Sequence, residues 1–346
     1  MIKTQSRIQR KTLTLILPTL PHLDSEADQT ISAPALQRFL SRGQCRKPEY
    51  SSALEMLSQI FGLDLPSQSD WPAAALTAQG LALTSDNEFW LCADPVYLHA
   101  DLDRLVLTDP VDLQIELAEA EQLVEYLNET CADLGWRFHR VSNGRWIVNS
   151  AKMLDVATTD LDAALAAGDR VILPIGADAR LMQKVLTEIQ MLLHDHPVNQ
   201  ARVHAGKLPI NSLWFWGGGV LPRAVERQPD VLITGRAFCQ GLGKLANVAV
   251  ESVKSFEQLS KLESASWVVV DLSAEDRLDS QAEFSPGKAI KQWERDWFAP
   301  IWQAMRAGEW HLLRILSPEF EAEIGSRQMK YFWKRPKRLS TILGVN

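Results

Sequence analysis

The feature that most constrains the fold is the alternation of short apolar runs with longer amphipathic segments along the chain. The short runs are rich in Val, Ile, Leu and Trp and are bounded by turn residues, which is typical of strands buried on both faces of a sheet. They predict strands at 13–17, 170–175, 212–216, 231–234, 267–271 and 311–316. Helical periodicity between them predicts helices at 33–42, 53–60, 178–194, 256–262 and 286–306. This order of elements predicts an α/β fold with a mostly parallel sheet.

A segment in the first half of the chain follows a different pattern. The residues predict strands at 89–98 and 104–107, a helix at 117–134, and two more strands at 136–141 and 145–148. Asn143-Gly144, between the last two strands, is a strong hairpin signal. We therefore expect residues 88–169 to form an inserted α+β subdomain. Residues 1–87 and 170–346 are then expected to form a discontinuous core.

Charge, hydropathy and cysteine spacing exclude several broad functions. The net charge of −7 argues against a general nucleic-acid binder, whose surface would be basic. No apolar run approaches the roughly 20 residues that a membrane helix needs. The basic residues ahead of 13–17 weakly resemble a signal peptide, but Pro18 and Pro21 stand where a cleavage site would be. The four cysteines are widely spaced and predict free thiols, so we expect a cytoplasmic protein that binds neither nucleic acid nor membrane.

Tryptophan is unusually frequent, with twelve residues against four tyrosines. Most of them fall in predicted strands or, like Trp293 and Trp297, on one face of a predicted helix, so we assign them to core packing. Trp71, Trp90 and Trp333 remain as candidates for a contact surface.

Two short motifs resemble ligand sites without matching a known spacing. The run Gly217, Gly218 and Gly219 follows a predicted strand but is neither GxGxxG nor a P-loop. It allows close backbone approach, either of an anion or of a packed neighbour. The alternating segment 194–196, His-Asp-His, could hold a metal, but Pro197 follows it. We therefore place it at a helix C-terminus, where histidine is electrostatically favoured.

Two charged segments also allow more than one interpretation. Acidic residues follow the predicted strand 267–271, where open α/β sheets bind ligands and where Mg²⁺ or Mn²⁺ would accept carboxylates. A solvated loop is the alternative. The segment 330–338 is basic with interleaved aromatics. It could grip an anionic partner or, as we prefer, dock its aromatic rings and leave its charges in water.

Longer segments carry a resemblance to a known family. HPVNQAR at 196–202 and GKLPIN at 206–211, followed by the glycines and Pro222, resemble the pattern of archaeal-type cofactor-independent phosphoglycerate mutases, which belong to the alkaline phosphatase superfamily. ADPVYL at 93–98 and FWKRP at 332–336 are similar to RpfE-type regulatory proteins. The resemblance implies an alkaline phosphatase-like, mostly parallel sheet flanked by helices.

The resemblance also implies a catalytic serine. The segment 51–58 is similar to the family's segment around its nucleophile, and Ser52 is the best match for that residue. These mutases pass a phosphoryl group through a phosphoserine, while two divalent metals activate the serine and clamp the phosphate.

This sequence departs from the family at the metal ligands. Leu17 stands where the first strand should end in a metal-binding Asp, and Ala53 and Met56 replace the Asp and His beside the nucleophile. Ser280 replaces the His of the DxxGH motif, and the later Asp-His pair falls near Ser317. Without the metals, the serine hydroxyl has no evident means of activation.

We therefore expect a phosphoglycerate mutase-like protein that has lost its two-metal centre and acts as a regulatory or metabolite-binding protein. No cofactor is expected, and the ligand is expected to be a small phosphorylated or carboxylate metabolite. The residues expected to bind it are Asn199, Arg202, Asn211, Gly217, Gly218, Gly219 and Arg223.

Two alternatives remain open. An active metal-dependent phosphoryl-transfer enzyme would use Ser52 as its nucleophile and bind Mn²⁺ or Mg²⁺ through carboxylates. Those carboxylates would be Asp24, Asp271, Glu275, Asp276 and Asp279. An interaction protein would instead bind a protein partner through a Trp-rich surface and the basic tail.

Overall fold

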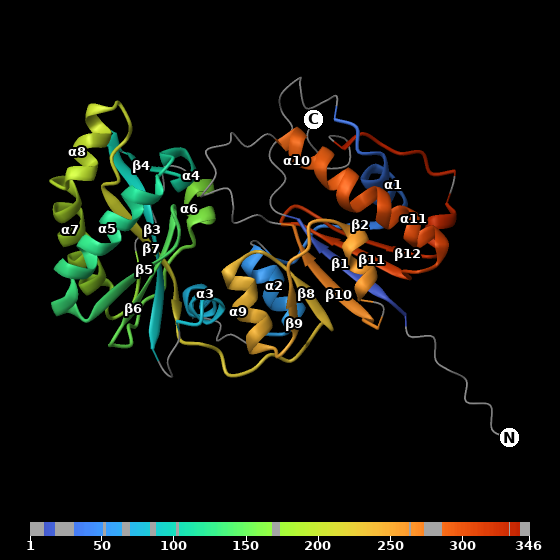
Figure 1. Cartoon of the computed structure of the whole chain (residues 1–346), viewed down its shortest axis with the longest axis horizontal. Coiled ribbons are helices and arrows are strands. Elements are labelled where there is room, and N and C mark those ends of the chain that lie inside the picture. The colour runs from blue at the N-terminus through green and yellow to red at the C-terminus, as the bar shows by residue number, and fades with distance from the viewer. Residues whose placement is uncertain are drawn as a thin grey trace.

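The chain folds into two β-sheets that are each packed against helices (Figure 1). Helices α3 (Ala73–Gly80) and α9 (Ala237–Leu245) meet between the two sheets. The computed structural model describes residues 10–17, 31–50, 53–63, 70–83, 88–101, 104–167, 174–262, 264–272, 286–331 and 333–339.

The larger sheet belongs to the core. Within the described residues its strand order is β2-β12-β11-β1-β10-β8-β9. Strands β11, β1, β10, β8 and β9 run parallel, and β12 is antiparallel to both of its neighbours. The bounds are β1 Thr12–Ile16, β2 Gln44–Arg46, β8 Val231–Ile233, β9 Ala249–Glu251, β10 Trp267–Asp271, β11 Leu312–Leu316 and β12 Glu321–Gly325.

Apolar clusters cover both faces of the core sheet. Successive side chains of β1 point to opposite faces, so this strand contributes to both clusters. Leu13 and Leu15 join one apolar cluster with α1 (Pro34–Arg42) and α11 (Ala299–Ala307). Ile16 joins another cluster with α9 and with α2, which spans residues 53–61. The predicted apolar strand is therefore confirmed, and it is apolar because both of its faces are buried.

The second sheet has the path β4-β3-β6-β5, and β7 pairs with β3. Its strands are β3 Phe89–Asp101, β4 Arg104–Thr108, β5 Trp136–Ser142, β6 Arg145–Ser150 and β7 Ser212–Gly219. The predicted Asn143-Gly144 hairpin is confirmed, because Ser142 pairs with Arg145 across it. The helices around this sheet are α4 Pro110–Leu113, α5 Leu117–Thr130, α6 Leu161–Ala167, α7 Ala179–His194 and α8 Pro197–His204.

The inserted unit extends further than we expected. We placed its end at residue 169 and assigned the strand at 212–216 to the core sheet. Instead β7 pairs antiparallel with β3, with Ala93 opposite Phe215. The apolar faces of α7 and α8 pack on the same sheet. The core therefore resumes only after residue 219. The sequence could not show this, because an apolar run indicates that a strand is buried but not which distant strand it pairs with. Most of the predicted strand 170–175 lies outside the described residues.

The long helix predicted over 286–306 contains a change of winding. It consists of α10 (Pro286–Trp293), a π-helical turn (Glu294–Phe298) and then α11. Glu294, in the π turn, accepts hydrogen bonds from the backbone nitrogens of Ala35 (2.7 Å) and Leu36 (3.1 Å). Helix α1 has no side-chain cap at its own N-cap residue. Glu294 therefore supplies acceptors for donors that a helix start leaves unsatisfied.

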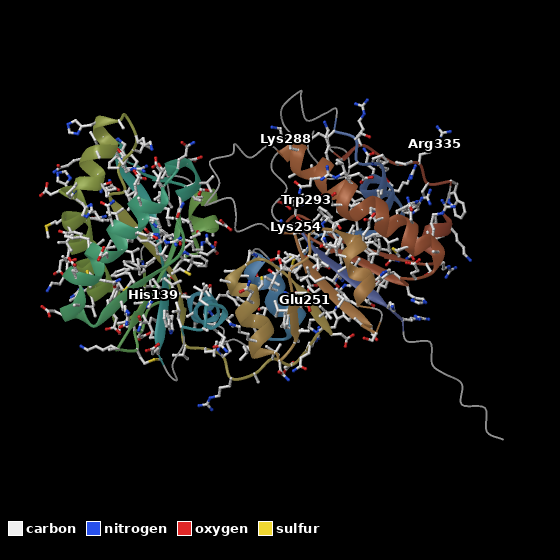
Figure 2. All side chains as sticks on the ribbon, viewed as in Figure 1. His139, Glu251, Lys254, Lys288, Trp293 and Arg335 are labelled. Atoms are coloured by element: carbon white, nitrogen blue, oxygen red, sulfur yellow. The ribbon has the colours of Figure 1, made fainter. Side chains whose placement is uncertain are left out.

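The tryptophans are mostly packing residues. Trp293 and Trp297 are buried as predicted, and Figure 2 labels Trp293 on its helix. Trp90 is buried in the cluster between the sheets, so its selection as a contact-surface candidate was wrong. Trp333 is 63% exposed and remains such a candidate.

Two further findings concern the cysteines and membrane insertion. The four cysteines are free thiols as predicted, with Cys45 exposed and the others buried. None of the described helices is both long enough and apolar enough to cross a membrane.

Candidate functional site

A row of side chains lies along the carboxyl edge of the parallel core strands. Open α/β sheets bind their ligands at this edge. Strand β1 is followed there by Leu17, β8 by Thr234 and β11 by Ser317, and β10 ends in Asp271. All four residues are buried, so the chemistry of the edge depends on which partners these side chains have.

Asp271 is the buried carboxylate at the centre of this edge. Its Oδ2 accepts hydrogen bonds from Arg236 Nε at 2.7 Å, Thr234 Oγ1 at 3.1 Å and Cys239 Sγ at 3.3 Å. The side chain of Asp271 is fully buried and that of Arg236 is 16% exposed. Burial raises the pKa of the Cys239 thiol, so the thiol donates as a neutral group. The sequence motif identified Asp271, but its three partners follow another strand and carried no local signal.

A second carboxylate at the edge is also paired with an arginine, although the Arg46 side chain is 68% exposed. Glu321, at the start of antiparallel β12, forms an ion pair with Arg46 at 2.5 Å. Burial and the nearby Glu321 raise the pKa of the Tyr50 hydroxyl. Ser317 donates a hydrogen bond to Glu319. The described edge therefore pairs its carboxylates with guanidinium or hydroxyl groups of the chain itself.

These residues do not fit a pair of divalent cations. A two-metal site needs several carboxylates or imidazoles around each ion. The described strand ends offer leucine and hydroxyl side chains, and Asp271 already binds a positive charge. Among the described residues, no group of three His, Cys, Asp or Glu side chains is placed to hold a metal ion.

The remaining residues proposed for catalysis and metal binding cannot be placed. Ser52, Asp24, Glu275, Asp276 and Asp279 lie outside the described residues. Helix α2 begins directly after Ser52, and Tyr50 precedes it at the carboxyl edge.

Two of the residues proposed to bind an anion, Asn199 and Arg202, hold the inserted unit together. Asn199 Nδ2 donates to the carbonyls of Leu193 and Ile210, both at 2.7 Å, and its Oδ1 accepts from the Ile210 nitrogen. Arg202 is 1% exposed, and its NH1 donates to Glu119 Oε2 at 2.6 Å. Its Nε and NH2 donate to backbone carbonyls. These contacts explain the two residues as internal anchors.

Asn211 and His196 also make structural contacts. Asn211 exchanges two hydrogen bonds of 2.8 Å with the backbone of Leu98, in the manner of a paired strand residue. His196 Nδ1 accepts from the Val198 nitrogen and caps α8, directly after α7 ends at His194. The predicted helix C-terminus is thus confirmed for His194, whereas His196 instead caps the start of the next helix.

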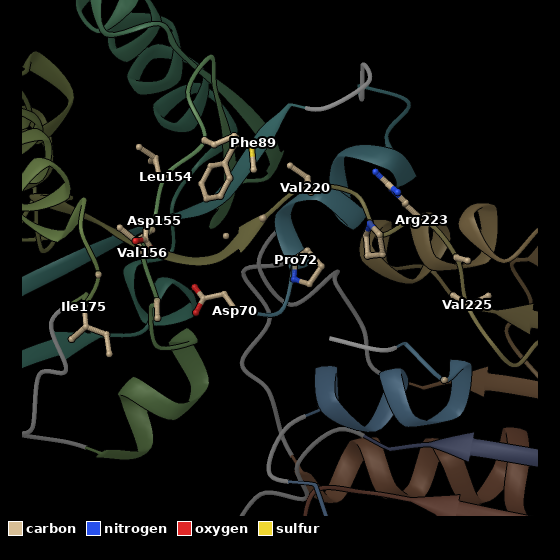
Figure 3. Close-up of a pocket in the computed structure, with 18 of the residues that line it drawn as sticks. Asp70, Pro72, Phe89, Leu154, Asp155, Val156, Ile175, Val220, Arg223 and Val225 are labelled. Carbon is tan, nitrogen blue, oxygen red and sulfur yellow. The ribbon is translucent and has the colours of Figure 1, made fainter. Parts of the chain in front are cut away.

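The glycine run and Arg223 lie at a cavity of about 1130 Å³ beside the return from the insert to the core. Gly218, Gly219 and Arg223 line it, whereas Asn199, Arg202 and Asn211 do not. Figure 3 shows Asp155 and Ile175 on one side and Arg223 and Val225 on the other. Gly217 packs its backbone on α3, because an added Cβ would lie 3.0 Å from the Ala73 Cβ.

This cavity is separate from the carboxyl edge. Gly62 lines it and follows the end of α2, whereas Tyr50 and the start of α2 are at the edge. Nine helical residues span roughly 13 Å. The structure therefore divides the residues predicted for one anion site between internal anchors and a cavity on another side of the core.

Asp70 is a cavity residue that the sequence motifs did not identify. Its Oδ1 accepts from the Thr158 nitrogen at 2.8 Å, and its Oδ2 accepts from the Thr158 hydroxyl. Burial raises the pKa of the Asp70 carboxyl, against these hydrogen bonds. Asp70 thereby ties the connection between α2 and α3 to the segment before α6.

Comparison with known proteins gives relatives of one kind, although no protein-family model matches the chain. The 2,3-bisphosphoglycerate-independent phosphoglycerate mutase of Methanosarcina mazei is 27% identical over 241 residues, which cover 65% of this chain and 59% of the relative. The mutase of the same name from Methanosarcina acetivorans is 24% identical over 327 residues, covering 86% and 80%. The match to the M. mazei protein thus spans less than two thirds of that protein's length.

A solved structure supports the fold. The PH0037 protein from Pyrococcus horikoshii aligns with a TM-score of 0.55 at 14% identity, covering 92% of this chain and 88% of that one. The predicted fold class, an alkaline phosphatase-like mostly parallel sheet flanked by helices, is confirmed. By sequence, the homologues of this chain are archaeal-type cofactor-independent phosphoglycerate mutases.

Proposed function

We propose that this chain is a phosphoglycerate mutase-like protein that acts by binding, as a regulatory protein of the cytoplasm, and not by phosphoryl transfer. The observation that carries the proposal is the ion pair between Arg236 and Asp271, 2.7 Å apart at the carboxyl edge of the core sheet. A divalent cation bound to Asp271 would have to displace a mostly buried guanidinium or lie beside it. Like charges at such separations repel strongly where water is excluded. The hydroxyl and leucine side chains at the neighbouring strand ends support the same conclusion.

The test is a mutase assay with its own internal control. Purified protein is supplied with Mn²⁺ and 3-phosphoglycerate, and Ser52→Ala is measured beside it. We expect the two rates to be equal and close to the rate without protein. A Mn²⁺-dependent rate that disappears in Ser52→Ala would establish the alternative, an active phosphoryl-transfer enzyme.

For the ligand, we propose a small metabolite with one phosphate or carboxylate group, bound in the cavity beside Arg223. Arginine recognises such groups without a metal. The lining also includes Asp70, Asp155 and Glu226. Its carboxylates therefore outnumber Arg223, which favours a ligand whose single anionic group is accompanied by hydroxyl groups.

Calorimetry with glycerol 3-phosphate, which carries one phosphate and two hydroxyl groups, tests this ligand. Arg223→Ala is expected to weaken binding at least tenfold, because a charge-assisted hydrogen bond contributes about 1.5–3 kcal/mol. Arg227→Ala removes an exposed arginine that does not line the cavity and is the matched control. If the unaltered protein did not bind, the ligand proposal would be wrong, whereas the conclusion from the mutase assay would still stand.

A further inference from the structure

Charge is distributed very unevenly between the two ends of the molecule. The segments 34–42 and 327–339 together contain eight Lys and Arg residues and no Asp or Glu. The segment 105–136 contains eight Asp and Glu residues and no Lys or Arg. In Figure 1, α5 lies at one end of the molecule, and α1 with the C-terminal region lies at the other. An acidic protein thus carries one basic end.

The basic end presents an aromatic and cationic surface. The Lys337 nitrogen donates to Ser41 Oγ at 2.9 Å, and Arg42 NH1 donates to the Met329 carbonyl at 2.9 Å, so the segment is held against α1. Trp333 is 63% exposed and its ring centroid lies 5.1 Å from that of Tyr331. Figure 2 shows Arg335 pointing away from the molecule. We call this the tail surface, formed by Tyr331, Trp333, Lys334, Arg335, Lys337 and Arg338, of which all but Tyr331 are exposed.

The acidic end presents a groove with complementary chemistry. Helix α5 places Glu121, Glu125 and Glu129 four residues apart, on one exposed face. With Val124, Asn128 and Arg140 these side chains line a groove of about 530 Å³, which we call the acidic groove. Arg140 lies at 4.0 Å from Glu121, and within the described part of the chain Glu125 and Glu129 form no ion pair. Two carboxylates are therefore available to cations from outside.

We propose that the tail surface of one copy of this chain binds the acidic groove of a second copy. The indole of Trp333 would lie on Val124, and the adjacent cations would meet the two available carboxylates. The two surfaces lie at opposite ends of one molecule, so the contact forms between copies and is head-to-tail. Such heterologous contacts extend into chains or close into rings. The acidic body disfavours large polyanions, whereas a second copy supplies its carboxylates together in one groove.

The first measurement is the mass of the protein in solution. Sedimentation velocity is recorded over a hundredfold range of protein concentration, at about 0.05 M and about 1 M salt. The Debye length is above 10 Å in the first buffer and about 3 Å in the second. We expect the average mass to rise with concentration at low salt and to stay that of the monomer at high salt. A monomer at every concentration in low salt overturns the proposal.

Charge-reversal variants identify the two surfaces. Lys334→Glu with Arg335→Glu removes the tail surface, and Glu125→Lys with Glu129→Lys removes the groove. Each variant alone is expected to be monomeric. An equimolar mixture is expected to associate, because the unaltered groove of one variant meets the unaltered tail surface of the other. A chain with all four changes is expected to associate again.

A control separates this contact from a general effect of charge. Arg180→Glu with Lys184→Glu reverses two exposed cations on α7 and should leave association unchanged. The proposal is overturned if this control abolishes association as fully as the tail variant does. It is also overturned if the two complementary variants fail to pair when mixed while both keep the circular dichroism spectrum of the unaltered protein.

Discussion

At the scale of single residues, the surroundings decide what a charged side chain does. Arg202 and Lys207 form ion pairs of nearly equal length with Glu119 and Glu116, at 2.6 and 2.7 Å. Arg202 is 1% exposed, whereas Lys207 is 38% exposed. Removing a buried partner leaves polar groups without a hydrogen-bond partner from water or protein, and removing an exposed one does not. Two ion pairs of similar length therefore contribute differently to the free energy of unfolding.

Arg202→Ala is expected to lower the free energy of unfolding by about 3 kcal/mol, because it leaves two backbone carbonyls and Glu119 without their donor. Lys207→Ala should cost less than about 1 kcal/mol. Urea denaturation of the three proteins measures both effects. If Arg202 served mainly to bind a ligand, its replacement would weaken ligand binding at little cost in stability, contrary to our assignment.

At the scale of elements, two helices connect the halves of the molecule by close backbone contact. A Cβ added at Gly241 of α9 would lie 1.7 Å from the Leu76 carbonyl oxygen. One added at Gly80 of α3 would lie 1.9 Å from the Ala237 carbonyl oxygen. No side chain fits at either position. The contact lets a single apolar cluster include residues of both sheets, which explains why the halves pack as one body.

Gly241→Ala should therefore lower the free energy of unfolding by at least about 2 kcal/mol, since backbone must move to admit a methyl group. Gly235, just before α9, is the matched control because an added Cβ there meets nothing within 4 Å. Gly235→Ala is expected to change stability by less than about 0.5 kcal/mol. Thermal unfolding followed by circular dichroism compares the stability of the two variants. Equal losses of stability would show that α3 and α9 separate easily.

At the scale of the whole molecule, folding buries three carboxylates that come from different parts of the chain. Asp70 connects α2 with α3, Asp160 precedes α6, and Asp94 lies in β3 against the shared cluster. Burial raises the pKa of all three carboxyls. Trp216 Nε1 donates to Asp94 at 2.8 Å, and Arg145 lies 3.6 Å away, and both lower the pKa less than burial raises it.

The sign of the resulting pH dependence follows from linkage. Because the pKa of Asp94 is higher in the folded than in the unfolded chain, its contribution to stability is fully present below about pH 4. It is lost as the pH rises through the folded pKa. Asp94→Asn keeps an acceptor for Trp216 and removes the titration. We expect the free energy of unfolding of the variant, minus that of the unaltered protein, to rise between pH 4 and pH 7 in urea titrations. A decrease would mean that attraction by Arg145 outweighs burial.

The sequence predicted the candidate site only where its signals were local. Asp271 could be placed because it ends an apolar strand, and the glycine run and Arg223 could be connected by a family resemblance. Arg236 and Cys239 could not be connected to Asp271, which is more than thirty residues away in the chain. Asp70 had no motif at all. Contacts between side chains at the ends of different strands cannot be predicted from a short window of sequence.

By itself the sequence determined the nature of the elements, because hydrophobic period and turn residues act over a few neighbouring positions. The buried strand β1, the Asn143-Gly144 hairpin and the long helix α7 all follow from such local patterns. Only the tertiary structure decided that β7 joins the inserted sheet and that Arg236 neutralises Asp271. Both depend on packing between segments far apart in the chain, where burial and charge pairing select one partner among many that are locally equivalent.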